Sequence, residues 1–287
     1  MVFPWNKKEY KDAENWSKFS KSRILLPVNC ISAWFDICGY GEILSRCNWD
    51  LSTVQQKGFI ELLNCLHQQI AHPFIALPPI ITEKILILND GLARTCDIIS
   101  SNGLNYIAIP FTFYIRDLFF SYKFSLKLCK NFGLGLRAVL SGGERIQYSS
   151  EIFTGSSILT HDSNNISKFG NDLLQTNFLY NPAEFQMNTA FAKGFSIDNM
   201  GSKFGIEPNK FFIERSFWEK CCLIPFINHE ISNQEIHLKY LNKIIIKMFI
   251  NKSIEFDILN LKVTVDNIEA IELNMPHENE VVLCRLE

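Results

Sequence analysis

The sequence lacks the cysteine spacing that marks zinc sites and disulfide frameworks. It has nine cysteines, an odd number, and they are scattered along the chain. Only Cys221 and Cys222 are adjacent, and no Cys-x-x-Cys pair occurs. Structural zinc sites and small secreted domains both depend on cysteines paired at regular spacing. We therefore expect reduced thiols and a cytoplasmic protein.

Excess charge and long apolar runs are lacking too. Lys and Arg number 28 against 30 Asp and Glu, so the formal net charge is only -2. Such a chain has no overall positive field to attract nucleic acid or an anionic membrane. Residues 1–21 have no apolar core of a secretory signal, and the most apolar runs, 106–122 and 244–250, are interrupted by charge or short. We expect neither a membrane nor polymeric nucleic acid as a partner.

The first part of the chain alternates strand-like apolar runs with helical spacings, as a folded globular protein does. Strand-like runs lie at 24–37, 74–79, 81–88 and 136–140. Helical patterns lie at 60–70 and 105–128. The order βαββαβ predicts the α+β class, a ferredoxin-like or palm-like core with an antiparallel or mixed sheet and helices on one face. We expect the last of these strands to end at Ser141-Gly142-Gly143.

Composition divides the chain into three segments. We assign residues 1–22 to an N-terminal extension, 23–215 to the main domain, and 216–287 to a small C-terminal accessory segment. Within the main domain, residues 147–182 are rich in Ser, Thr, Asn and Asp and predict a loop-rich insertion. Further elements are predicted as helices at 185–195 and 235–249 and as strands at 254–265 and 281–283.

Two aspartates end neighbouring apolar runs beside glycine turns. Asp36 begins Asp36-Ile37-Cys38-Gly39-Tyr40-Gly41, where the carbonyl of Ile37 can face the same point as the carboxylate and the turn amides can meet a triphosphate. Asp90, in Asn89-Asp90-Gly91, would supply a second carboxylate. Two Mg²⁺ or Mn²⁺ ions held there could activate a 3′-hydroxyl and neutralise a leaving pyrophosphate. Either aspartate alone would fit an ordinary turn as well.

Three stretches together resemble the class III adenylyl and guanylyl cyclase family, as a divergent bacterial-type member. Phe35-Asp36-Ile37-Cys38-Gly39-Tyr40 resembles the family's first-strand motif, and Ile87-Leu88-Asn89-Asp90-Gly91 resembles its Ile-Gly-Asp strand. Residues 136–144 are similar to its Leu-Arg-x-x-Ile-x-x-Gly strand and turn. The resemblance implies a palm-like core, a head-to-tail homodimer with sites at its interface, and cyclisation of a nucleoside triphosphate with two divalent ions.

The family's later motif, Val-Asn-x-Ala-x-Arg, is matched only in its first half. Asn188 takes the place of the Asn that orders the ribose, but Ala192 stands where the family has the Arg that stabilises the transition state. Lys193 is the neighbouring cation, about 100° further around a helix. Arg145, after the glycine pair, is another candidate for phosphate contact. Asn188 also fits a helix N-cap, and the two cations also fit solvated surface positions.

The family's base-reading positions fall on Leu86 and Asn181. Leucine cannot hydrogen-bond a purine edge, so the usual purine selectivity is not supported and pyrimidine-using bacterial cyclases come into question. Three functions therefore stay open. The first is a nucleotidyl cyclase that makes a cyclic nucleotide signal. The second is a cyclase-fold module that binds a nucleotide or a protein partner without turnover, and the third is a palm-type oligonucleotide synthase.

Overall fold

A computed structural model describes the chain at residues 27–71, 83–98, 105–146, 187–232, 234–258, 260–274 and 281–286. The chain forms two compact units. The smaller consists of Met1–Val28 and Arg145–Asn188, and the larger of Asn29–Glu144 and Thr189–Glu287. The fold set out below is that of the larger unit.

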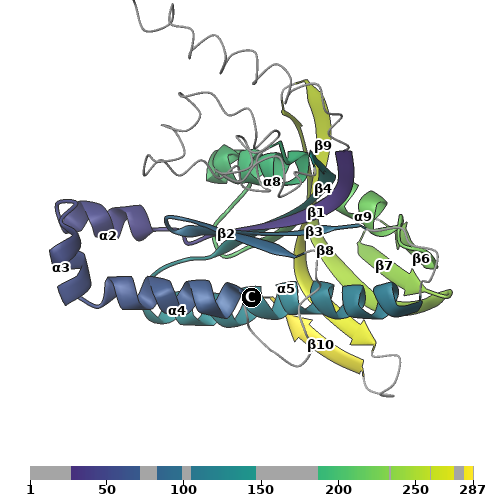
Figure 1. Cartoon of the computed structure of the whole chain (residues 1–287), viewed down its shortest axis with the longest axis horizontal. Helices are drawn as coiled ribbons and strands as arrows, with labels where there is room; N and C mark the ends of the chain where they lie inside the picture. Colours follow the sequence, from purple (N-terminus) through teal and green to yellow (C-terminus); the bar gives the residue numbers. More distant parts are fainter. Residues whose placement is uncertain are drawn as a thin grey trace, which may run out of the picture. The chain divides into compact units, whose positions relative to one another are not determined.

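A mixed sheet of ten strands organises the larger unit (Figure 1). Its order is β2-β3-β1-β4-β5-β9-β8-β7-β6, and β10 pairs with β9. β4 and β5 are parallel, whereas β1 with β3 and β5 with β9 are antiparallel. The strands are β1 (Pro27–Asp36), β2 (Lys84–Leu88), β3 (Gly91–Asp97), β4 (Arg137–Ile146), β5 (Phe211–Glu214), β6 (Ile227–Ile231), β7 (Glu235–Tyr240), β8 (Lys243–Ile258), β9 (Leu261–Asn274) and β10 (Val281–Arg285). The predicted α+β class is confirmed.

Helices cover both faces of the sheet, not one as predicted. The described helices are α2 (Tyr40–Arg46), α3 (Leu51–Gln56), α4 (Phe59–Ala71), α5 (Asn105–Asn131), α8 (Thr189–Met200), α9 (Ser216–Cys221) and a 3-10 turn, η2 (Ser202–Phe204). α4 and α5 bury the main core on one face, and α8 covers the other face (Figure 1). Because side chains alternate along β1, Phe35 enters the main core while Trp34 and Asp36 face the side of α8.

The predicted order βαββαβ is confirmed, but its middle strand pair is shifted along the chain. β2 pairs with β3 across the two-residue loop Asn89-Asp90, and the predicted strand at 74–79 lies outside the described residues. β3 was not predicted, because its sequence contains Arg94, Thr95 and Asp97 and so lacks an apolar run. Asn89 has φ 53°, a left-handed conformation that asparagine tolerates. Asp90 therefore lies in a tight hairpin loop.

β4 does not end at Ser141-Gly142-Gly143 as predicted; it continues to Ile146. The two glycines serve close packing instead of a turn. A Cβ atom on Gly142 would overlap the backbone of Ser216, and one on Gly143 would overlap the backbone of Ala190. The first turns of α8 and α9 thus approach β4 at distances that only glycine permits.

The predicted helix at 235–249 is wrong, because this segment forms the hairpin of β7 and β8. Ile236 and Leu238 are buried at strand spacing, and Leu241 and Asn242 both have positive φ, 49° and 63°. Two such residues between strands are typical of a type I′ hairpin turn. The residues after 216 thus add strands to the same sheet. The predicted domain boundaries stay predictions.

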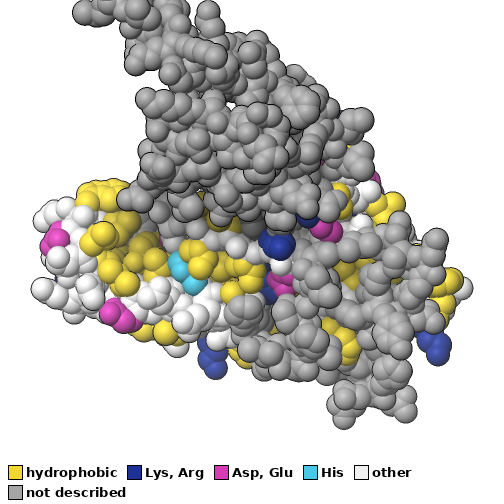
Figure 2. All heavy atoms as spheres, viewed as in Figure 1, with side chains coloured by type: hydrophobic (Ala, Val, Ile, Leu, Met, Phe, Trp, Pro, Cys, Tyr) yellow, Lys and Arg dark blue, Asp and Glu magenta, His cyan; other side chains and the backbone are white. Residues whose placement is uncertain are grey.

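Within the described ranges, no helix has the length and apolarity needed to cross a membrane. Apolar side chains do gather at the surface around α2 and α3, at the left of Figure 2. Trp49, between these two helices, and Leu51, the first residue of α3, are 69% and 64% exposed.

A buried arginine joins the sheet to the helices of the main core. Arg94 on β3 is 3% exposed, and its Nε donates to Glu83 at 2.6 Å. Its Nη1 donates to the carbonyl of Ile70 in α4 at 3.0 Å and to the hydroxyl of Ser121 in α5 at 3.1 Å. The guanidinium also lies over the ring of Tyr114, 5.3 Å from its centroid. One side chain therefore links β3, α4 and α5.

We predict that Arg94→Met lowers the free energy of unfolding by about 3 kcal/mol or more, because Glu83 would be left buried without its cation. Urea denaturation at neutral pH measures this. Arg46→Met is the control: its pair with Glu42 is exposed, and losing it should change stability by less than about 1 kcal/mol. Equal effects of the two substitutions would contradict the role given to Arg94.

Candidate functional site

Asp36 and Asp90 lie together where β1 and β3 meet the β2–β3 loop. Asp36 is in register with Gly91, the residue after Asp90. The amide of Ile37 donates to the carbonyl of Asp90 at 3.1 Å. Asp36 is the last residue of β1, and Asp90 immediately precedes β3. The structure therefore brings together the two aspartates that the sequence paired.

A third carboxylate and an arginine join this pair. Arg137 on β4 donates from Nη2 to Oδ2 of Asp36 at 3.1 Å, from Nε to Asp198 of α8, and from Nη1 to the carbonyl of Ile206 at 3.0 Å. Asp198 is buried and was not predicted, because it lies three residues beyond the helix expected at 185–195, whereas α8 continues to Met200. The one available signal was a carboxylate beside Ile197 on the apolar side of that helix.

Burial and the neighbouring charge of Asp198 shift the protonation of Asp36 and Asp90. Burial first, and then the charge of Asp198, raise the pKa of Asp36 to about 6, although Arg137 and a hydrogen bond from Cys38 oppose the shift. Burial and Asp198 also raise the pKa of Asp90. Asp36 and Asp198 thus share one guanidinium, with Asp90 beside them. A divalent cation would relieve this excess of negative charge.

The turn after Asp36 offers fewer free amides than predicted. The amide of Ile37 is bonded to Asp90, and the amide of Cys38 donates to the carbonyl of Gly135 at 3.0 Å. The Tyr40 hydroxyl donates to the carbonyl of Phe59 at 3.3 Å. Gly39 and Gly41 are the exposed residues of the turn, and Gly39 has φ 95°, which favours glycine. A phosphate could therefore approach at these two glycines.

The thiol of Cys38 contributes as a neutral donor. It lies 3.4 Å from Oδ2 of Asp36. Burial and the charge of Asp36 raise the pKa of Cys38 to about 12, so the thiol keeps its proton at neutral pH. It therefore supports the ionised form of Asp36.

The two aspartates fit a magnesium or manganese site that is completed by a ligand. In the part of the chain that the structure describes, no group of three or more His, Cys, Asp or Glu side chains is placed to hold a metal ion. Magnesium is commonly held by one or two carboxylates, with water and substrate phosphates supplying the other oxygens. Asp36 and Asp90 match that smaller donor set.

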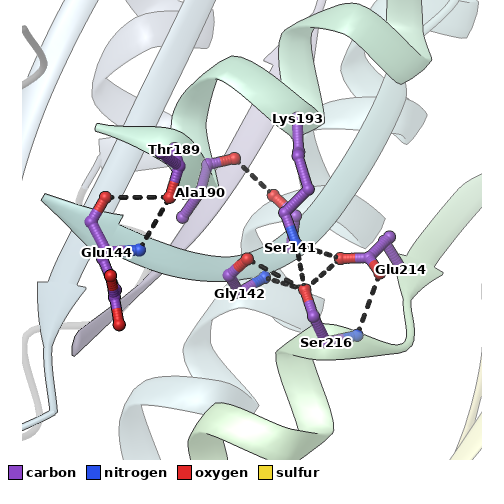
Figure 3. Close-up of polar contacts among 8 residues, drawn as sticks. All are labelled: Ser141, Gly142, Glu144, Thr189, Ala190, Lys193, Glu214 and Ser216. Atoms are coloured by element: carbon purple, nitrogen blue, oxygen red, sulfur yellow. Dashed lines mark hydrogen bonds and ion pairs between the residues drawn. The ribbon is translucent and has the colours of Figure 1, made fainter. Parts of the chain in front are cut away.

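Lys193 belongs to a separate network beneath α8 (Figure 3). Its ammonium lies 2.9 Å from Glu214, a buried carboxylate, and also bonds Ser216. The Ser216 hydroxyl contacts Glu214 and the carbonyl of Gly142, the latter at 2.8 Å. In this structure the charge of Lys193 is therefore paired with a carboxylate of the protein.

The remaining predicted residues are spread over both units. Arg145 and Asn188 belong to the smaller unit, where they are buried and form an isolated antiparallel bridge with each other. Leu86 on β2 is half-buried and lies in register with Ala93 of β3. Asn181 and the predicted insertion at 147–182 lie outside the described residues.

We predict that Asp36→Asn stabilises the fold at pH 8 but not at pH 4. The folded-state pKa of Asp36, about 6, lies above its ordinary value of 3.8. The folded state therefore binds the extra proton, and the stability from Asp36 is lost as the pH rises through 6. Removing the carboxylate should raise the free energy of unfolding by about 2 kcal/mol at pH 8, allowing for its partial exposure. Urea denaturation at both pH values measures this, and an equal change at both would contradict it.

Comparisons with known proteins give similarity of structure only. No protein-family model matches the sequence, and no curated protein does. Among solved structures, the chain is similar to the guanylyl cyclase Cya2, with 9% identity over 88% of this chain and 97% of that one, at a TM-score of 0.44. It is also similar to the adenylyl cyclase CyaB from P. aeruginosa, with 10% identity over 86% and 96% and a TM-score of 0.42. Likeness at this level carries no conclusion about activity, ligand or assembly.

Proposed function

We propose that the chain is a cytoplasmic, homodimeric nucleotidyl cyclase, which converts a nucleoside triphosphate to a cyclic nucleotide and pyrophosphate with two Mg²⁺ or Mn²⁺ ions. The observation that carries this proposal is the convergence of Asp36 and Asp90 beside an exposed glycine turn. Burial of both carboxylates and the charge of Asp198, which Arg137 offsets only in part at Asp36, favour a cation there and the phosphates it binds.

Asp36 and Asp90 would hold the ions, with the carbonyl of Ile37 beside them. When bound there, divalent ions lower the pKa of an attacking hydroxyl and neutralise charge on the departing pyrophosphate. Arg137 lowers the pKa of Asp36 against the effect of burial, so that at pH 8 this carboxylate is mostly ionised and able to bind a cation. Gly39 and Gly41 leave the turn open to the phosphates.

The side chain at the base-reading position decides which triphosphates are to be tested. Leu86 cannot make the hydrogen bond by which a side chain selects a purine, so pyrimidine triphosphates belong among the substrates to be tested. A linear product would instead indicate the palm-type oligonucleotide synthase that the same carboxylates could serve.

Binding without turnover is the second candidate, and the surroundings of α8 favour it. Ala192 is exposed and carries no charge, and Lys193 is paired with Glu214. No cation of this helix segment is therefore poised to stabilise a transition state, a contribution that catalysis of phosphoryl transfer usually requires. A protein with this arrangement could hold a metal and a nucleotide as a signal-binding module.

We predict that the full chain, incubated with Mn²⁺ and each of the four nucleoside triphosphates, releases pyrophosphate and a cyclic mononucleotide from at least one of them. Asp36→Asn and Asp90→Asn should each lower the rate by about 100-fold, because each removes a metal ligand. Asp97→Asn, at the opposite end of β3, is the matched control and should leave the rate unchanged. Nucleotide binding without pyrophosphate release would establish the second candidate instead.

We further predict that Ala192→Arg raises kcat by about 10-fold with little change in KM, because it adds a cation where transition-state charge develops. The exposed position on α8 can accept the longer side chain without a clash. Ala192→Gln, of similar length but uncharged, is the control and should not increase kcat. An unchanged kcat in the arginine variant would show that position 192 does not face the triphosphate.

A further inference from the structure

Trp34 is buried beside the carboxylates, yet its N–H group is unsatisfied. It precedes Asp36 by two residues on β1, so both side chains lie on the same face of the sheet. Its side chain is 4% exposed, and Nε1 has no hydrogen-bond partner among the described residues. A buried donor without an acceptor costs about 1–3 kcal/mol. Nε1 of Trp218 is buried in the same way, so what singles out Trp34 is its place beside Asp36.

The indole ring lies across β3 toward the loop that carries Asp90. A Cβ atom on Gly91 would overlap Cη2 and Cζ2 of Trp34, so glycine is required there for the ring to lie in this place. The six-membered ring of the indole, at Cη2, Cζ2 and Cζ3, thus lies over Gly91, next to Asp90 in the chain. Cζ2 is bonded to the carbon that carries Nε1.

Aromatic and apolar side chains surround the ring. Phe191 and Phe195 of α8 contact it edge-on, with centroid separations of 5.8 and 5.4 Å. Phe195 is 40% exposed, so this cluster reaches the surface. On the sheet, Trp34 is in register with Ala93, and Ala93 is in register with Leu86. Trp34 and Leu86 therefore lie in one cross-strand row with only a small side chain between them.

Together with the proposed function, on which this inference rests, these contacts identify a surface for a planar ring. We propose that Trp34, Phe195 and Leu86 bind the base of the nucleotide, and that Nε1 of Trp34 donates to a carbonyl oxygen of that base. Uracil, cytosine and guanine carry an exocyclic carbonyl oxygen, and adenine does not. The site then prefers bases with a carbonyl oxygen over adenine. Leu86 alone would give no such preference, because its side chain forms no hydrogen bonds.

Two variants of the full chain test this, with Mn²⁺ and titration calorimetry. Trp34→Phe keeps an aromatic ring and removes the N–H group. It should weaken binding of a non-hydrolysable UTP analogue by about 10-fold, the effect of losing one buried hydrogen bond. It should leave the affinity for inorganic tripolyphosphate, which has no base, unchanged. Trp49→Phe, at an exposed position, is the matched control and should change neither affinity.

The outcomes separate this inference from the proposed function. If Trp34→Phe weakens the UTP analogue and tripolyphosphate equally, or weakens neither, the inference is overturned while the nucleotide site stands. If the wild-type chain binds neither ligand, the proposed function fails as well. The wild-type chain gives a second measurement that does not depend on the variant folding: it should bind the UTP analogue about 10-fold more tightly than the ATP analogue, and equal affinities would overturn the inference.

Discussion

The guanidinium of Arg137 between Asp36 and Asp198 is the contact on which the candidate site depends. It joins β4 to β1 and to α8, and so fixes the helix that carries Phe191, Phe195 and Asp198 over the sheet face that carries Asp36. Burial, and after it the charge of Asp198, raises the pKa of Asp36 and of Asp90. The same arrangement that holds the helix in place therefore also makes the strand ends favourable for a divalent cation.

The site has two halves of different character. The carboxylate half is assembled from adjacent backbone segments, since Asp36 is in register with Gly91 and the amide of Ile37 is bonded to the carbonyl of Asp90. The half that should stabilise a transition state is replaced by structural contacts, since Lys193 is paired with Glu214 and Ser216 while Ala192 offers no charge. A base surface formed with Trp34 would give a role to the two phenylalanines of α8, Phe191 and Phe195. The ligand-binding half of the proposed cyclase site is consequently more complete than its catalytic half.

Patterns that act over a few residues were predictable from the sequence. The aspartates before their glycine turns, the amphipathic spacing of α4 and the apolar stretch of α5 each follow from local chemistry, and so does the βαββαβ order. Long-range contacts were not predictable in this way. Arg137 and Asp198 are 61 residues apart in the sequence. Gly142 and Gly143 predict a turn by local chemistry, and only the folded structure shows that they allow α8 and α9 to pack against β4. β3 was not predicted because it lacks an apolar run. Its buried Arg94 is accommodated by hydrogen bonds to three other segments of the chain, which the local sequence does not indicate.

Diffraction from crystals grown with Mn²⁺ and a non-hydrolysable nucleoside triphosphate tests the central claim most directly, because manganese can be located by its anomalous signal. We expect an anomalous peak about 2.2 Å from carboxylate oxygens of both Asp36 and Asp90, with phosphate oxygens completing the coordination of the manganese ion. We also expect Arg137 to keep its bond to Asp198 while Asp36 turns to the ion. A peak bound by neither aspartate, or an Asp36 that stays paired with Arg137 while the nucleotide is bound elsewhere, would contradict this claim.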